Sequence, residues 1–173
     1  METAKSAIRH PVFFNRYVEQ VGPGDICNLL AESIQQLEHD LKIIGQTDCS
    51  FAYAPEKWSI STLVRHCIDT EMIFAFRALS IARKDPNPIR SFAENQYALE
   101  AEKEYGFHLL SQEFLHIRRA TALLFQGFDK EWMTRTGQME NGELISVHSL
   151  GYIVVGHWLH HRKILATRYG IKF

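Results

Sequence analysis

Apolar residues recur at steps of three and four along several long stretches of the chain, which is the pattern of amphipathic helices. The first stretch begins after Asp25, a side chain suited to capping a helix, and ends near Gly45. The second begins at Ser59, another capping residue, and continues to about Arg83. The Asp-Pro-Asn-Pro run at 85–88 stops it, because proline cannot continue a helix. The first half of the chain therefore predicts two long helices.

The apolar positions of the second stretch predict the face that its helix buries. They are Leu63, Ile68, Met72, Phe76, Leu79 and Ile81. Before the first helix the pattern is weak, and Phe13, Phe14 and Tyr17 predict only a short element packed on the body.

The second half of the chain predicts two more helices. A crossover loop is expected at about 89–95, followed by one long third helix at 97–125, which Gly127 ends. The last helix is expected at about 146–169, closed by Gly170.

A hairpin is expected between these two helices. Residues 129–143 mix Gly, Thr, Asn and Met, and Asn141-Gly142 is a strong turn signal. No stretch sustains the alternation of longer strands. Together, the elements predict an all-α fold in one domain over residues 1–173. The expected architecture is an antiparallel four-helix bundle with a longer crossover between its second and third helices and a short hairpin before the fourth.

Composition narrows the class of protein. The chain has 173 residues, enough for a substantial core, and 46% of them are apolar. Lys and Arg number 19 against 20 Asp and Glu, so we expect no nucleic-acid or membrane partner. We find no spanning apolar run and no signal peptide pattern. The three scattered cysteines are typical of reduced thiols, which predicts a cytoplasmic protein.

Histidine is the enriched metal-ligand type, with nine residues, and three of them fall within five residues of the last predicted helix, at 157, 160 and 161. On a helix, His157 and His161 lie about 40° apart and one turn above each other, which allows two imidazoles to share an ion. His157 and His160 lie about 60° apart, so spacing slightly favours His161 and leaves His160 open.

A third nitrogen is available on the second predicted helix. Alone, His66 is more often a core histidine with a hydrogen-bonded partner. Its helix face continues through Thr70, Ile73 and Arg77, which is polar for a bundle interior. Beside the pair at 157 and 161, His66 completes a three-nitrogen site, and three protein ligands are typical of catalytic zinc.

Several of these stretches resemble the DinB-like superfamily, in its YfiT-like branch. They are residues 55–60, His66, 69–71 and 74–79 for the family's second helix, 91–97 for its post-crossover segment and 146–169 for its last helix. The resemblance covers about residues 10–170. At a position near the start of the last helix where the family often has a basic residue, this chain has His148.

The resemblance implies a four-helix bundle that binds a divalent metal ion, commonly nickel or zinc, through three histidines. Carried over by motif, the ligands are His66, His157 and His161, which selects His161 over His160. Related members are transferases that depend on low-molecular-weight thiols such as bacillithiol or mycothiol, and others are assigned as metal-dependent hydrolases. Bundles of this family often form homodimers.

The leading hypothesis is therefore a metal-dependent enzyme in which a thiol or water attacks a small electrophilic molecule. The alternatives are a metal-dependent hydrolase and a non-catalytic bundle that binds metal or serves a stress response. Asp69 and Glu71 are candidates for orienting a ligand imidazole or transferring a proton, or they form salt bridges with Arg65 or Arg77. Arg77 is a candidate for anchoring an anionic group of the thiol, with a carboxylate partner as the alternative.

Overall fold

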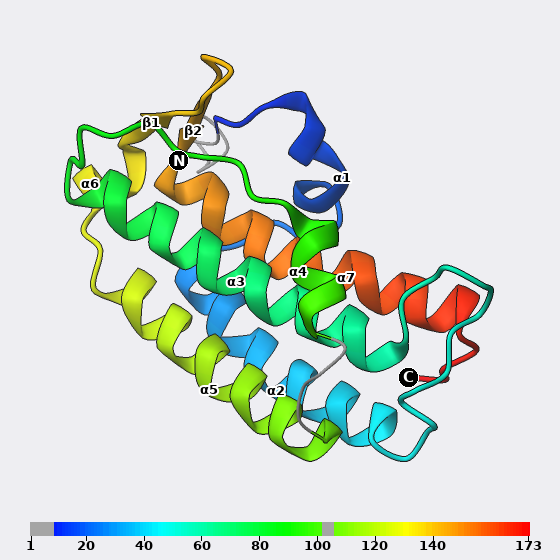
Figure 1. The fold of residues 1–173 in the computed structure, drawn as a ribbon. Helices are drawn as coiled ribbons and strands as arrows, with labels where there is room; N and C mark the ends of the chain where they lie inside the picture. Colours follow the sequence, from blue (N-terminus) through cyan, green and yellow to red (C-terminus); the bar gives the residue numbers. More distant parts are fainter. Residues whose placement is uncertain (1–8, 102–105) are drawn as a thin grey trace.

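Four long helices form a bundle in the computed structural model, which describes residues 9–101 and 106–173 (Figure 1). They are α2 (Ile26–Ile44), α3 (Ile60–Ala82), α5 (Phe107–Gln126) and α7 (Val147–Arg168). Both α2 and α3 pack against α5 and α7, so the two helices adjacent in sequence occupy opposite corners. The predicted four-helix bundle is confirmed.

The direction of the helices follows from the long crossover. Helices α3 and α5 run the same way, because the chain returns along the bundle between them, whereas α7 is antiparallel to α3 and α2 is antiparallel to α5 (Figure 1). None of the helices in the described ranges combines the length and the hydropathy needed to cross a membrane.

Helix ends lie close to where the capping residues predict them. The carboxylate of Asp25 accepts hydrogen bonds from the backbone N–H groups of Cys27 and Asn28, at 3.0 and 3.2 Å. The hydroxyl of Ser59 accepts one from the Thr62 N–H at 3.1 Å. After the last helix, Gly170 adopts a φ of +74°, a conformation that glycine reaches at little cost.

The single third helix expected at 97–125 is wrong. The structure has a short helix α4 (Glu94–Ala101) and a separate α5, while residues 102–105 between them lie outside the described residues. Helix α4 packs across α3 in the crossover (Figure 1). Gly106 precedes the first turn of α5, and apolar spacing alone does not reveal such a break.

The predicted hairpin is present before α7. Strands β1 (Thr136–Gln138) and β2 (Leu144–Ser146) pair antiparallel, and the turn contains Gly142 at a φ of +84°. A short helix α6 (Lys130–Thr134), which the pattern did not predict, comes before β1. The crossover joins this hairpin through the Ile89 N–H, which donates to the Gln138 carbonyl at 2.9 Å.

Two of the apolar positions expected in the core are instead on the surface. Met72 and Phe76 are 51% and 65% exposed, whereas Leu63 and Ile68 are buried as expected. Helix α3 buries the sides that meet α5 and α7, and these two residues, one turn apart, lie on its outward side. Periodicity alone did not separate an apolar outer position from an inner one.

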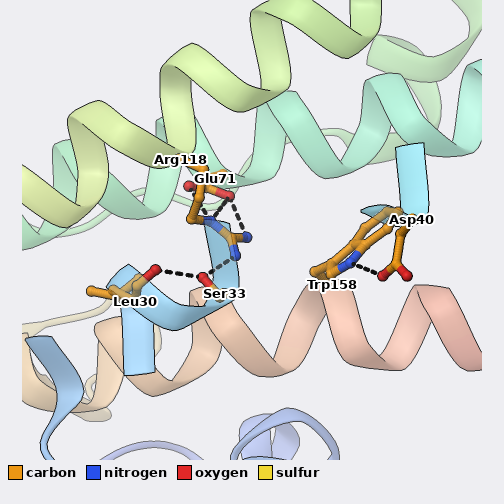
Figure 2. A network of polar contacts seen from close by, with 6 residues as sticks. All are labelled: Leu30, Ser33, Asp40, Glu71, Arg118 and Trp158. Atoms are coloured by element: carbon orange, nitrogen blue, oxygen red, sulfur yellow. Dashed lines mark hydrogen bonds and ion pairs between the residues drawn. The ribbon is translucent and has the colours of Figure 1, made fainter. Parts of the chain in front are cut away.

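Residue Trp158 anchors α7 beside the site described below. Its indole N–H donates to the buried carboxylate of Asp40 on α2 at 3.1 Å (Figure 2). Arg162 donates to the same carboxylate at 2.8 Å. Gln36 donates to the other oxygen at 2.9 Å. A buried carboxylate requires such donors, so these bonds set the position of α7 relative to α2.

A short N-terminal element covers the other side of α7. It consists of η2 (Val12–Phe14) and α1 (Asn15–Val18), and it buries Phe14 and Tyr17 against the bundle as the sequence predicts. The backbone of Tyr17 lies directly on Gly156 of α7, where a side chain would leave no room.

Candidate metal centre

Three histidines from two helices converge inside the bundle. His66 lies on α3, and His157 and His161 lie on α7. The Nε2 atom of His157 is 3.2 Å from Nε2 of His66 and 3.2 Å from Nε2 of His161. One nitrogen from each ring lies within 4.8 Å of the other two. All three residues are buried.

Hydrogen bonding alone does not account for this arrangement. A neutral imidazole nitrogen carries either one proton or one lone pair, so Nε2 of His157 can make one good hydrogen bond with its two neighbours. By contrast, two ligand nitrogens on a tetrahedral ion at zinc-like bond lengths stand about 3.3 Å apart. The donor set therefore fits a divalent cation.

Burial keeps these imidazoles neutral. It lowers the pKa of His66 from 6.5 to about 4. It also lowers the pKa of His157 and of His161 well below 6.5, with a further contribution from the neighbouring histidines. A neutral ring offers its lone pair to a metal ion, so the environment favours the ligand form.

His160, the alternative that spacing left open, points elsewhere. It is partly exposed, and its Nδ1 atom lies 3.4 Å from the side-chain nitrogen of Gln20. Its ring contacts Tyr17, with ring centres 5.3 Å apart. The structure thus brings His161, and not His160, to His66 and His157.

Aromatic and polar side chains surround the three rings. The ring of Tyr17 lies edge-on to His157 at 5.1 Å, and the Trp58 ring lies 4.9 Å from His66. The Thr70 hydroxyl is 3.5 Å from Nδ1 of His66, a contact that helps to orient the ring. Sequence reasoning gave Tyr17 no role here, because nothing local indicates that the N-terminal element covers α7.

The two candidate carboxylates on α3 are engaged in ion pairs. Asp69 lies 3.6 Å from Arg65, which is one of the partners expected for it. Glu71 accepts three hydrogen bonds from Arg118 of α5, at 2.7 to 3.0 Å (Figure 2). Arg118 also donates to Ser33 of α2 at 2.8 Å, so this buried pair links three helices.

Arg118 is a partner that the sequence did not indicate, because it lies on a helix far away in the chain. Both members of its pair with Glu71 are buried. Among the described residues, no aspartate or glutamate joins the group formed by the three histidines. The roles suggested for Asp69 and Glu71 stay predictions.

The third candidate, Arg77, is buried on α3. Its guanidinium donates to the backbone carbonyl of Arg90 at 2.5 Å. It lies 5.5 Å from the centre of the Phe74 ring, and that ring lies 6.2 Å from the His157 ring. No carboxylate of the described residues forms an ion pair with it.

The profile of the DinB superfamily matches residues 29–165. The chain belongs to the DinB superfamily. The match spans α3 and most of α7, and therefore includes all three histidines of the buried group. No curated protein matches the sequence of this DinB-superfamily chain.

Solved structures share the fold of this superfamily member. YfiT from Bacillus subtilis, a probable metal-dependent hydrolase with an unusual four-helix bundle topology, has a TM-score of 0.71 at 17% identity. The match covers 85% of this chain and 87% of YfiT. The mycothiol-dependent maleylpyruvate isomerase has a TM-score of 0.66 at 11% identity, over 89% of this chain and 63% of the isomerase. At these identities the likeness shows the fold alone.

Proposed function

We propose that this protein is a metal-dependent enzyme that activates a low-molecular-weight thiol for attack on a small electrophilic molecule. The observation that carries the proposal is the convergence of the Nε2 atoms of His66, His157 and His161 in the bundle interior. These residues would hold a divalent ion, nickel or zinc. When bound, such an ion lowers the pKa of a coordinated thiol or water and so supplies a nucleophile at neutral pH.

The number and state of the histidines support this role. Three protein ligands are typical of catalytic zinc sites, whereas structural sites commonly use four. Burial keeps the imidazoles unprotonated, since it lowers the pKa of His66 to about 4. Tyr17 and Trp58 shield two of the rings from water, which strengthens electrostatic interactions inside the site.

Hydrolysis of an amide or ester is the second candidate, favoured by the fold shared with YfiT. Hydrolysis is accelerated by a carboxylate that takes a proton from the attacking water. Glu71 is the carboxylate named for this role, but both of its oxygens accept hydrogen bonds from Arg118. We therefore prefer a thiol, for which the mycothiol-dependent isomerase with the same fold is a precedent.

We further propose that the enzyme acts in the cytoplasm on a small-molecule substrate. Its three cysteines, Cys27, Cys49 and Cys67, are free, which suits a reducing compartment. Formation of a homodimer, implied by the family resemblance, stays a prediction.

Metal content and thiol conjugation, measured together, test the proposal. Purified wild type should contain about one divalent ion per chain and conjugate a thiol to an electrophile, and His157→Ala should lose both. His160→Ala is the matched control, because it removes a neighbouring imidazole that lies outside the group, and it should retain both. A metal-free wild type with full activity would refute the proposal.

A second measurement separates catalysis from mere metal binding. In cobalt-substituted protein, the visible spectrum should change when a thiol is added, because the thiol enters the coordination sphere. An unchanged spectrum with every thiol tested, together with no turnover, would favour a non-catalytic binding protein.

A further inference from the structure

Arg77 differs from the other buried arginines of the bundle. Arg65 donates two hydrogen bonds to the Glu113 carboxylate. Arg118 donates at least two to the Glu71 carboxylate. Arg77 is only 7% exposed, yet among the described residues its one hydrogen bond goes to the Arg90 carbonyl. A guanidinium has five N–H donors, and a buried charge is costly without a counter-charge. Arg77 therefore retains capacity to bind an anion.

A cavity of about 370 Å³ opens beside this guanidinium. Its walls come from α3, α4 and the crossover, and most of the surface that lines it is apolar. The side chains that matter here are Ile73, Phe76, Arg77, Phe92 and Tyr97. Arg90 and Asp85 also line the cavity, and of these three charged residues only Arg77 is buried. A mostly apolar pocket with a few charged groups is the usual form of a small-molecule site.

The acidic side chains near this cavity are already engaged elsewhere. The Glu140 carboxylate accepts hydrogen bonds from the backbone N–H and the hydroxyl of Ser91, both at 2.9 Å. The Asp85 carboxylate accepts from the backbone and side-chain nitrogens of Asn87, at 2.9 and 2.8 Å. Burial lowers the pKa of Arg77, and Glu140 opposes this effect only from a distance beyond an ion pair. The guanidinium is thus desolvated but not neutralised by a contact.

The cavity lies along the same side of α3 as the histidine group. His66, Thr70, Ile73 and Arg77 follow each other at helical steps on one face. Phe74 lies close to both the histidine group and Arg77. The centre of its ring is 6.2 Å from the centre of the His157 ring and 5.5 Å from Cζ of Arg77. The guanidinium is therefore no farther from the His157 ring than the sum of these two distances. The cavity and the histidine group are thus neighbours on either side of the buried Phe74 ring, although none of the three histidines lines the cavity.

We propose that this cavity binds the carboxylate end of a small organic molecule. Arg77 pairs with the carboxylate, and the aromatic side chains of Phe76, Phe92 and Tyr97 pack on the apolar part. The carboxylate belongs to either the thiol or the electrophile of the reaction. This last assignment rests on the proposed function, whereas carboxylate binding itself requires no metal.

Calorimetric titration of the chelator-treated full chain tests the cavity alone. Phenylacetate should bind at least about tenfold tighter than phenylacetamide, because only the carboxylate adds a negative charge to its hydrogen bonds with the guanidinium. Arg77→Met should abolish this preference, and Arg77→Lys should retain part of it. Arg83→Met, which removes an exposed arginine at the end of the same helix, should keep the full preference.

Two results would overturn the proposal: equal binding of both probes by wild type, or an unchanged preference in folded Arg77→Met. Should that variant not fold, Phe76→Ser serves instead, because this exposed wall residue can be changed without touching the charge. It should weaken phenylacetate binding several-fold, and unaltered affinity would equally overturn the proposal.

Competition in the metal-loaded protein identifies the source of the carboxylate. Phenylacetate should compete with whichever of the two, thiol or electrophile, carries the anionic group. Competition with neither would overturn the link to the reaction while leaving the metal-free binding result intact. The absence of metal-dependent conjugation in wild type would instead count against the proposed function. A failure of the proposed function is therefore distinguishable from a failure of the link between the cavity and the reaction.

Discussion

A β-carbon on Gly156 would lie 2.1 Å from the carbonyl oxygen of Tyr17. The N-terminal element therefore rests on the backbone of α7 one residue before His157, and the absence of a side chain at 156 permits this contact. The approach also brings the Tyr17 ring against His157 and His160, at 5.1 and 5.3 Å.

Gly156→Ala should therefore displace the N-terminal element and destabilise the protein. Alanine favours a helix by about 1 kcal/mol over glycine, but overpacking against backbone costs about 1–3 kcal/mol or more. We expect a net loss of stability in urea denaturation. Gly22→Ala is the control, because a β-carbon there would meet nothing within 4 Å and stability should be kept. A Gly156→Ala variant as stable as wild type would contradict the role of this contact.

Glu71→Gln should destabilise the protein by about 3–5 kcal/mol, because it leaves the buried charge of Arg118 without its partner. Urea denaturation measures the effect. The same substitution at Glu38, in an exposed pair with Lys42, should leave stability unchanged. If Glu71 instead transfers protons in catalysis, the variant will lose turnover while keeping its denaturation midpoint.

Removal of the metal ion should lower the stability of wild type. An ion that binds only the folded state at a concentration of 100 times its Kd contributes about 2.7 kcal/mol. We expect a chelator to lower the thermal midpoint of wild type and of His160→Ala, and to have no effect on His66→Ala. A midpoint of wild type that does not respond to chelation would argue against an ion held by this group.

His148 should make the protein sensitive to acid. It is buried near Tyr152, and this burial lowers its pKa below 6.5, against a weaker opposite effect of Asp25. The unfolded chain takes up this proton near pH 6.5 and the folded chain only at lower pH. Stability is therefore complete above about pH 6.5 and falls as the pH drops from there toward the folded-state pKa.

The measurement for His148 is the free energy of unfolding as a function of pH. Below about pH 6.5, His148→Gln should reduce the slope of the unfolding free energy against pH, because glutamine does not titrate. The reduction corresponds to the uptake of up to one proton fewer per molecule on unfolding. Identical slopes for wild type and variant over this range would show that His148 is not responsible.

Local signals in the sequence were sufficient for α2, α3 and α7 and for the ends of these helices. Asp25 and Ser59 cap helices where predicted, and the turn at Asn141-Gly142 joins two strands. These features depend on residues within one or two turns of each other, so neighbouring residues carry the information. The spacing of His157 and His161 is likewise a local feature, because the two residues lie one helical turn apart.

Other features depend on residues far apart in the chain. The exposure of Met72 and Phe76 was not predicted, because periodicity does not say which side of a helix meets a neighbour. Arg118 as the partner of Glu71 was missed for the same reason. The separation of α4 from α5 was not predicted because apolar spacing does not reveal the break at Gly106.

The sequence by itself determined a four-helix bundle, a histidine pair at helical spacing and a candidate third nitrogen at His66. Only the tertiary structure decided that Nε2 of His66 lies 3.2 Å from Nε2 of His157, that Tyr17 packs on His157, and that Arg77 faces a cavity without a carboxylate partner among the described residues. The physical reason is that helical periodicity identifies the residues that share a face, while the packing of helices decides which faces meet.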